Sequence, residues 1–348
     1  MHAMVFHGPG RRSWDEVPDP TILDPTDALV QIDSVTICGT DLHILHGDVP
    51  EVDEGRVLGH EAVGTVIEIG SSVGQVKVGD RVLMSCISAC GSCRFCREGR
   101  YGQCVGGGGW LLGHTVDGTQ AEIVRVPFAD RSTHRIPPGV SDEQMLMLAD
   151  IVPTSHEVGV LNGRVRPGDT VVVIGAGPIG LASVMTASLY SPLCIVVVDT
   201  VGSRLAAASK IGADVVVDPT SDDVVDVVSS LTGGLGADVA IEAVGVPETF
   251  EQAVTTVRPG GHIANIGVHG RPAVLHLEAI WSRDVTITTG LVDTFSTPTL
   301  IALVEGGKLD PSAVVTHHFA MSEFDLAYDV FAHAEESGAL KVVVSSDR

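Results

Sequence analysis

The chain has 348 residues, of which 44% are hydrophobic, 4% aromatic and 19% charged. A chain of this length is too long for one small core and favours two domains, or one domain with a large insertion. Its 44 acidic against 21 basic residues give a net charge of −23. This charge argues against nucleic acid or an anionic membrane surface as partner, because a phosphate backbone needs a basic face.

The start of the chain, the lengths of its apolar runs and its cysteines indicate the cellular compartment of the protein. The start, MHAMVFHGPGRRSW, lacks the apolar stretch of a secretory signal. The longest apolar runs, such as VVVIGAG at 171–177, are too short to span a bilayer. Four of the seven cysteines lie within fifteen residues, which in an intracellular protein favours metal binding over disulfides. We therefore expect a cytoplasmic protein.

Three regions differ in pattern along the chain. Residues 1–150 hold short alternating stretches, ALVQIDSV, AVGTVIEIG, DRVLMSC and AEIVRVP, which predict antiparallel strands in a partly open β-barrel. Residues 151–290 alternate near-continuous Val and Ile runs with Ala-rich stretches such as PIGLASVMTASLY, which predicts a doubly wound parallel sheet. Residues 291–348 add helices and a last strand, LKVVVSS. We expect them to return to the first domain, so that the sheet domain is an insertion.

The segment of residues 90–104 carries four cysteines in the pattern C-x2-C-x2-C-x7-C. Four thiolates around one ion in a tight loop form a saturated tetrahedral site with no open position, which is typical of structural zinc. An iron–sulfur cluster is the alternative, but the last interval differs from the bacterial ferredoxin spacing and no proline follows the fourth cysteine. The predicted ligands of this zinc are Cys90, Cys93, Cys96 and Cys104.

The stretch TVVVIGAGPIGLASV places three glycines directly after a strand and at the head of a helix. In that context the first glycine makes a tight turn, the second lets the backbone approach a pyrophosphate, and the third lets helix and strand pack closely. The pattern therefore predicts a dinucleotide site formed by Gly175, Gly177, Pro178, Ile179 and Gly180.

The identity of the dinucleotide follows from the next strand, CIVVVD, which ends in Asp199. An acid at this position accepts hydrogen bonds from the adenosine ribose hydroxyls of NAD and repels the 2′-phosphate of NADP. The triple Gly202-Ser203-Arg204 could grip a 2′-phosphate if it ended the strand directly, but it lies three residues later. We expect NAD, with Arg204 opening the following helix and kept as a cofactor-binding candidate.

Further polar residues lie in ICGTDLH, which holds Cys38, and in GHEAVGTVIEIG, which holds His60 and Glu61. Taken singly, each has an ordinary structural explanation. Together with the four-cysteine loop, GAGPIG at 175–180 and the terminal LKVVV, they make the sequence resemble the zinc-containing medium-chain alcohol dehydrogenases over essentially its whole length. Within that family, LADIVPTSHEVGVL at 149–161 looks like the branch acting on small secondary alcohols.

This resemblance implies a Rossmann domain inserted in a GroES-like catalytic domain, and a catalytic zinc held by Cys38, His60 and Asp150. The fourth position is left for water or substrate. One thiolate and one carboxylate neutralise the dication, and the carboxylate makes the metal easier to strip. Thr40 and His43 match the family's proton relay. Zinc lowers the pKa of the bound alcohol, the proton leaves through the Thr40 hydroxyl and the nicotinamide ribose to His43, and hydride passes to NAD.

Other site residues rest on the same resemblance. Glu61 lies behind the metal, where it either exchanges with a ligand or orients one. Thr154 matches the position beneath the nicotinamide ring, and Lys341 matches a basic residue near the pyrophosphate. Trp110 looks like a wall of the substrate pocket, where an indole favours short alkyl groups. No motif recruits Cys86, which we expect to be structural.

The sequence thus predicts an NAD-dependent zinc alcohol dehydrogenase that interconverts small, secondary alcohols and carbonyl compounds. Polyols, diols and formaldehyde-type substrates stay open, because patterns fix pocket linings poorly. A non-catalytic zinc-binding relative would show damage to the zinc ligands or the glycines, and a zinc-free quinone reductase would lack the four-cysteine loop; a thiol-based redox sensor is a third alternative. The branch suggests a homotetramer.

Overall fold

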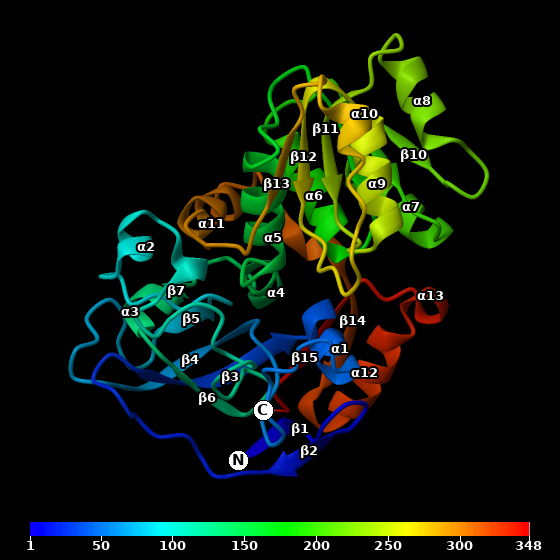
Figure 1. Cartoon of the computed structure of the whole chain (residues 1–348). Helices are drawn as coiled ribbons and strands as arrows, with labels where there is room; N and C mark the ends of the chain where they lie inside the picture. The colour runs from blue at the N-terminus through cyan, green and yellow to red at the C-terminus, as the bar shows by residue number, and fades with distance from the viewer. Residues whose placement is uncertain (348) are drawn as a thin grey trace. The chain divides into compact units, whose positions relative to one another are not determined.

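The computed structural model describes residues 1–347, which fall into two compact units (Figure 1). The first unit combines Met1–Pro153 with the segment that begins at Val292, and the second unit is Thr154–Leu291. The chain therefore leaves the first unit once, builds the second, and comes back. Within the described residues, no helix is both long enough and apolar enough to cross a membrane.

The first unit is built on a seven-stranded sheet in the order β14-β15-β3-β4-β5-β7, with β6 also paired to β3. The pairs β3–β4, β4–β5 and β3–β6 are antiparallel, as the alternating sequence predicts. The strands β1 and β2 form a separate two-stranded sheet in the same unit. Its strands are β1 (His2–Phe6), β2 (Arg12–Glu16), β3 (Ala28–Thr36), β4 (Ala62–Ile69), β5 (Arg81–Met84), β6 (Ile123–Val126), β7 (Thr133–Arg135), β14 (Val315–Ala320) and β15 (Lys341–Ser345).

Short helices surround this sheet, and the C-terminal ones come from the returning segment. The last strand, β15, pairs with β3, so the returning segment is part of the first unit's sheet. The helices are α1 (Gly39–His46), α2 (Arg94–Arg97), η1 (Tyr101–Gln103), α3 (Ala129–Ser132), α4 (Asp142–Leu146), α5 (Ile151–Thr154), α11 (Thr297–Glu305), η3 (Pro311–Val314), η4 (Met321–Glu323), α12 (Phe324–Ala332) and α13 (Ala334–Ser337).

The second unit is a six-stranded parallel sheet in the order β10-β9-β8-β11-β12-β13. The chain moves outward from β8 in one direction and from β11 in the other, so right-handed crossovers place α6 and α7 on one face and α8 and α9 on the other. Its elements are η2 (Ser155–Leu161), β8 (Thr170–Ile174), α6 (Pro178–Ser188), β9 (Cys194–Val198), α7 (Gly202–Ile211), β10 (Val215–Val217), α8 (Val224–Leu231), β11 (Ala237–Glu242), α9 (Pro247–Thr256), β12 (Val257–Asn265), α10 (Leu277–Ile280) and β13 (Thr286–Thr289).

The apolar runs of the sequence become the buried strands of this sheet. Val171, Val172 and Val173 of β8 are fully buried, and so are Val196 and Val197 of β9. Strands covered on both faces have no polar side to present, which is why these runs do not alternate. Strand order reverses between β8 and β11, and ligands of such sheets bind at this switch point, outside the carboxyl ends of the strands. The predicted fold class, a doubly wound sheet joined to a β-barrel-like unit, is confirmed.

Candidate active site and metal centres

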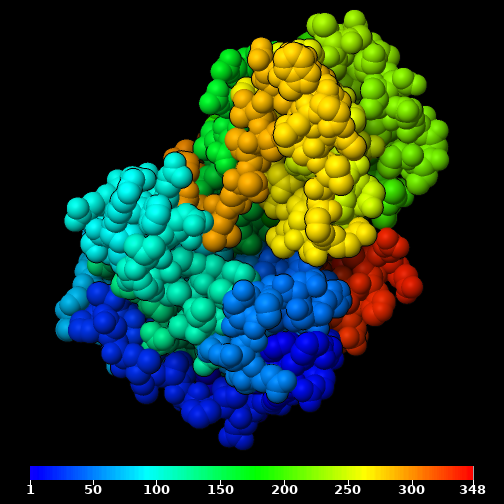
Figure 2. Space-filling view, viewed as in Figure 1, coloured from blue at the N-terminus to red at the C-terminus, as the bar shows by residue number. Residues whose placement is uncertain are grey.

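The four-cysteine loop lies at the surface of the first unit, in the cyan segment of Figure 2. Cys90 Sγ lies 3.9 Å from Cys96 Sγ, and Cys93 Sγ lies 3.9 Å from Cys104 Sγ. Zinc–sulfur bonds of about 2.3 Å at tetrahedral angles separate the sulfurs by about 3.8 Å. The four thiols therefore already have the spacing that a zinc ion needs.

Local backbone holds these sulfurs in place. The backbone N–H of Cys93 donates to Cys90 Sγ at 3.4 Å, and backbone N–H groups, that of Ser92 foremost, lower the pKa of the Cys90 thiol to about 6. A Cβ on Gly106 would lie 2.4 Å from Cys90 Sγ, and one on Gly108 would lie 2.9 Å from Cys104 Sγ. The loop thus needs glycine where the chain passes the cluster.

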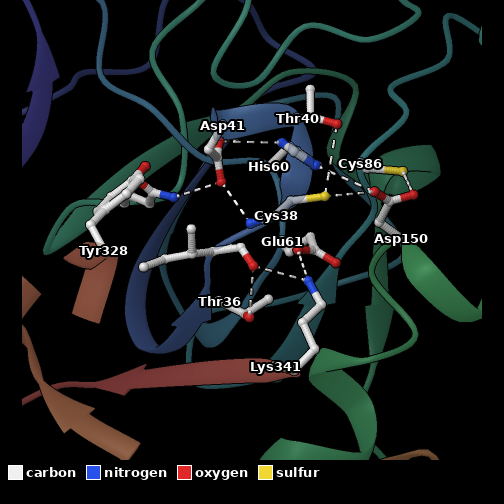
Figure 3. A network of polar contacts seen from close by, with 12 residues as sticks. Thr36, Cys38, Thr40, Asp41, His60, Glu61, Cys86, Asp150, Tyr328 and Lys341 are labelled. Atoms are coloured by element: carbon white, nitrogen blue, oxygen red, sulfur yellow. Dashed lines mark hydrogen bonds and ion pairs between the residues drawn. The ribbon is translucent and has the colours of Figure 1, made fainter. Parts of the chain in front are cut away.

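A second cluster forms where three distant segments meet (Figure 3). Cys38 is the residue before α1, His60 lies two residues before β4 begins, and Asp150 is the residue before α5. Asp150 Oδ2 is 3.3 Å from His60 Nε2 and 3.8 Å from Cys38 Sγ. One ligand atom from each of the three residues lies within 4.8 Å of the other two.

The donor set of this cluster fits zinc. Bonds of about 2.0 Å to nitrogen and oxygen and about 2.3 Å to sulfur, at tetrahedral angles, place N and O about 3.3 Å apart and S and O about 3.5 Å apart. The observed 3.3 and 3.8 Å are close to these values. Three protein ligands leave a tetrahedral ion one open position, which is the arrangement of catalytic zinc sites.

Two buried contacts beside the cluster were not indicated by sequence patterns: the pair of Glu61 with Lys341 and the pair of Cys86 with Asp150. Glu61 is fully buried and pairs with the ammonium of Lys341, which is 1% exposed and also donates to Ile37 O at 3.3 Å. The structure therefore gives Lys341 a partner other than the expected pyrophosphate. The Cys86 thiol donates to Asp150 Oδ1 at 3.6 Å. Burial raises the pKa of Cys86 well above its usual range, so it remains a donor.

Thr40 and His43 both lie on α1, just after Cys38. The Thr40 hydroxyl oxygen is 3.8 Å from Cys38 Sγ, so it borders the cluster. The His43 side chain is 36% exposed and its Nδ1 lies 2.8 Å from Asp48 Oδ2. Positions three apart share one helix face, so Thr40 and His43 lead from the cluster toward solvent.

Trp110 lies beside the same cluster. Its ring meets the His60 ring edge-on, with centroids 6.2 Å apart. On its other side it stacks on His114, with centroids 4.2 Å apart and planes inclined by 10°. A large flat side chain therefore stands next to a candidate metal ligand, held in orientation by a second ring.

The glycine-rich turn of the second unit follows β8 and opens α6. Gly175 has φ +99°, a left-handed conformation, and a Cβ on Gly180 would lie 1.8 Å from Gly175 O. Gly177 is the residue before α6, where a Cβ would meet nothing within 4 Å, and Pro178 is the first helical residue. Ile179 O accepts the hydroxyl of Ser155. The helix thus begins with its N–H groups at an open surface, suited to a pyrophosphate.

Asp199 lies at the end of β9 beside this turn. Its carboxylate accepts the backbone N–H of Ala176 at 2.7 Å and that of Val201 at 2.8 Å. A carboxylate has about four acceptor positions, so two remain for a ligand. Within residues 1–347, the buried Arg204 Nε has no hydrogen-bond partner. Thr154 is the residue before η2.

Models of two domain families match the chain. Residues 24–138 match the alcohol dehydrogenase GroES-like domain, and residues 178–305 match the zinc-binding dehydrogenase domain. An alcohol dehydrogenase of Cupriavidus necator is 40% identical over 99% of this chain and 98% of its own length. The solved structure of a zinc dependent alcohol dehydrogenase from Streptococcus pneumonia, in its apo form, superimposes with a TM-score of 0.96, is 44% identical, and matches 100% of this chain and 99% of its own.

The chain belongs to the zinc-dependent medium-chain alcohol dehydrogenases. It is therefore a zinc-type oxidoreductase that acts on CH–OH groups, and its two clusters indicate two zinc ions. The solved structure of a short chain alcohol dehydrogenase from Escherichia coli, complexed with NADH, is 27% identical over 99% of both chains, with a TM-score of 0.88.

Proposed function

We propose that this alcohol dehydrogenase uses NAD to interconvert short secondary alcohols and ketones at the cluster of Cys38, His60 and Asp150. The observation that carries the proposal is the convergence of one thiol, one imidazole and one carboxylate, from segments far apart in sequence, at the separations of a three-ligand zinc site. The four-cysteine cluster has no position left for a substrate, so it serves structure.

The residues of the cluster divide the work. When bound, Zn²⁺ supplies a Lewis acid that polarises the substrate oxygen, and NAD supplies the hydride acceptor. Asp150 is held by the Cys86 thiol on Oδ1, which leaves Oδ2 to face His60 and Cys38. Glu61, locked by Lys341, lies behind the ligands as a fixed negative charge.

The proton of the alcohol leaves along α1. The Thr40 hydroxyl borders the cluster and can accept this proton while donating its own onward. His43 stands on the same helix face, with one ring nitrogen beside Asp48 and the ring partly in water. Asp48 fixes the orientation of the ring, so His43 takes up the proton and releases it to solvent.

We propose NAD rather than NADP as cofactor because of the free acceptor positions of Asp199. A negatively charged group at the end of β9 accepts ribose hydroxyls and repels a 2′-phosphate. Arg204 has a buried Nε without a partner among the described residues, and we assign it to the adenosine half of the cofactor. Thr154 is proposed to support the nicotinamide.

The position of Trp110 supports the proposed substrate class. An indole standing beside His60, and held flat by His114, narrows the space next to the metal ligands. We propose that this wall admits the two short alkyl groups of a small secondary alcohol and excludes longer chains. A pocket lining of this kind discriminates by about 1–3 kcal/mol per methylene.

The test is an assay of NADH formation by its ultraviolet absorbance, with NAD or NADP against 2-propanol, 2-butanol, ethanol, sorbitol and 2,3-butanediol, before and after chelation. We expect NAD-dependent turnover, fastest with a secondary alcohol and lost on chelation. Preference for sorbitol or the diol would overturn the substrate class. Turnover with NADP alone would overturn the cofactor, and silence with every alcohol despite two bound zinc ions would overturn the assignment of activity to this cluster.

We also propose a homotetramer in the cytoplasm. Strand β13 is the edge of its sheet, and shortly before it in the chain Leu277 and Trp281 are 60% and 80% exposed. An open edge beside exposed apolar side chains is suited to a second copy. Light scattering that finds only monomer would contradict the proposed tetramer.

The proposed cytoplasmic location is supported by the cysteines, since free thiols at all seven suit a reducing compartment.

A further inference from the structure

Behind the candidate metal ligands lies a buried carboxylate that belongs to none of the sequence motifs' assigned roles. Asp41 is 1% exposed, and its Oδ2 accepts the backbone N–H of Cys38 at 2.9 Å. An acid three residues into a helix that reaches back to the preceding N–H forms half of a capping box. Asp41 therefore fixes the start of α1 and, with it, the Cys38 thiol.

The other oxygen of Asp41 faces the second ligand. Asp41 Oδ1 lies 3.9 Å from His60 Nδ1 (Figure 3), and neither atom has a hydrogen-bond partner within residues 1–347. A proton held on Nδ1 by a carboxylate leaves Nε2 with its lone pair free for a metal. A small movement of either side chain closes this contact, so its geometry depends on what holds Asp41.

Gln120 holds it. The Gln120 side-chain amide donates from Nε2 to Asp41 Oδ2 at 3.0 Å, and its Oε1 accepts the hydroxyl of Tyr328 at 2.7 Å. Gln120 also packs against the His60 segment, since a Cβ on Gly59 would lie 2.5 Å from Gln120 Cγ. Because a carboxylate accepts and does not donate, the amide must turn its NH₂ group to Asp41 and its oxygen to the phenol.

Tyr328 is the far end of this chain of contacts and comes from α12, in the returning C-terminal segment. It is 1% exposed, and burial raises the pKa of its hydroxyl well above the usual range, so it remains a donor. The guanidinium of Arg12 lies 4.4 Å from the centre of its ring and is itself bonded to Asp329 at 2.9 Å. The phenol is thus fixed from both sides.

We propose that Tyr328 and Gln120 are positioning residues of the catalytic metal centre: the phenol sets the orientation of the Gln120 amide, the amide sets Asp41, and Asp41 sets both Cys38 and His60. This inference rests on the proposed metal role of Cys38, His60 and Asp150. It ties the last helices of the chain to the first ligand segment through three hydrogen bonds. Without the phenol, Gln120 Oε1 loses the hydrogen-bond donor that holds this end of the amide, and the amide is held by Asp41 alone.

The test is Tyr328→Phe in the zinc-loaded full-length protein, with Tyr190→Phe as matched control. Tyr190 lies in the second unit, and its hydroxyl is bonded to His156 Nε2 at 3.0 Å, so the control also removes one bonded phenol oxygen. The readout is the rate of zinc release to a colorimetric chelator, followed by the visible spectrum of the Co²⁺-substituted protein. Loss of a direct ligand partner costs 10–100-fold in metal affinity.

Because Tyr328 acts on the ligands only through Gln120 and Asp41, we expect Tyr328→Phe to speed release of one of the two zinc ions by about 5–10-fold and to shift the Co²⁺ spectrum. Tyr190→Phe should do neither. Gln120→Met should have a larger effect, and the double variant should release zinc no faster than Gln120→Met alone, since the phenol acts through the amide. Independent, additive effects would overturn the proposal.

Unchanged zinc release and an unchanged Co²⁺ spectrum in Tyr328→Phe would also overturn it, even if the protein melted earlier, because that is the result of a purely structural tyrosine. If Tyr328→Phe does not fold, the Gln120→Met measurement stands in its place. Cys38→Ala separates the two levels of inference. If Cys38→Ala keeps both zinc ions, the proposed metal centre is wrong; if it loses one and Tyr328→Phe behaves as the parent protein, the positioning role alone is wrong.

Discussion

The two zinc clusters of the first unit are built in opposite ways. The four cysteines lie within one loop, and the longest interval among them is 14 positions; the loop's own backbone N–H groups hold the sulfurs. The Cys38 and Asp150 side chains are 112 positions apart in the sequence. Buried side chains from four further segments lie around them, namely Cys86, Gln120, Tyr328 and Lys341. A closed site that only holds a loop needs local chain alone, whereas an open site must be kept rigid while one position stays vacant for substrate.

This difference predicts separate consequences for the two clusters, and the largest lies in catalysis. Cys38→Ala removes one ligand of the open site, so we expect turnover to fall by about 10³-fold or more while elemental analysis finds one zinc ion left. The melting temperature should change little, because α1 keeps the capping contact of Asp41. Full activity with one zinc ion would show that the chemistry does not need this cluster.

Cys96→Ser should do the reverse. Cys96 is the buried member of the four-cysteine cluster, and its loss opens the loop. A loss of about 3 kcal/mol lowers the melting temperature by roughly 6–12 °C in a unit of this size, while kcat at low temperature stays within about twofold. The same fall in kcat as for Cys38→Ala, in a protein that still melts normally, would abolish the division between the clusters.

The same contrast explains what the sequence could foretell. Spacing alone identifies the cysteine loop, because its ligands are neighbours, and glycine positions together with strand patterns identify the turn after β8. No spacing links Gln120 and Tyr328 to Asp41, since their contacts exist only in the folded unit. Asp41 did carry a signal, its capping-box position three residues after Cys38.

Two further residues, Lys341 and Cys86, show that sequence patterns do not determine which buried polar groups pair with one another. The place of Lys341 near a pyrophosphate stays a prediction, but no motif indicated that its ammonium pairs with Glu61 inside the first unit. Cys86 belongs to no motif, yet its thiol holds Asp150. Buried polar groups find partners by proximity in three dimensions, so the sequence names the residue types and leaves the pairing open.

Asp150→Cys tests why the open cluster has a carboxylate. A thiolate binds zinc more strongly than a carboxylate of equal charge, so we expect this variant to lose its second zinc ion about 10-fold more slowly to a chelator. The zinc of the four-cysteine cluster, released at an unchanged rate, is the internal control. Equal rates before and after the substitution would mean that access to the site, and not its donor set, limits metal loss.

The smallest predicted effect is on the pH dependence of stability. It distinguishes loss of zinc at low pH from unfolding, at low pH, of the unit that carries both clusters. Burial lowers the pKa of His134, on β7, to about 4. The unfolded chain takes up this proton near pH 6.5 and the folded chain only near pH 4, so the stability contributed by neutral His134 is complete above about pH 6.5 and is lost as the pH falls through this window. His134→Gln should remove about 1 kcal/mol of that pH dependence, allowing for partial solvent contact. Urea unfolding at pH 7 and pH 4.5 measures this difference in stability.

His156 and His262, whose pKa values burial also lowers, should leave part of the pH dependence of stability in place in the variant. If the free energy of unfolding changed equally with pH in the parent protein and in His134→Gln, the prediction would be wrong. Zinc loss at low pH would then be assigned to protonation of the ligands, and not to destabilisation of the sheet that holds them.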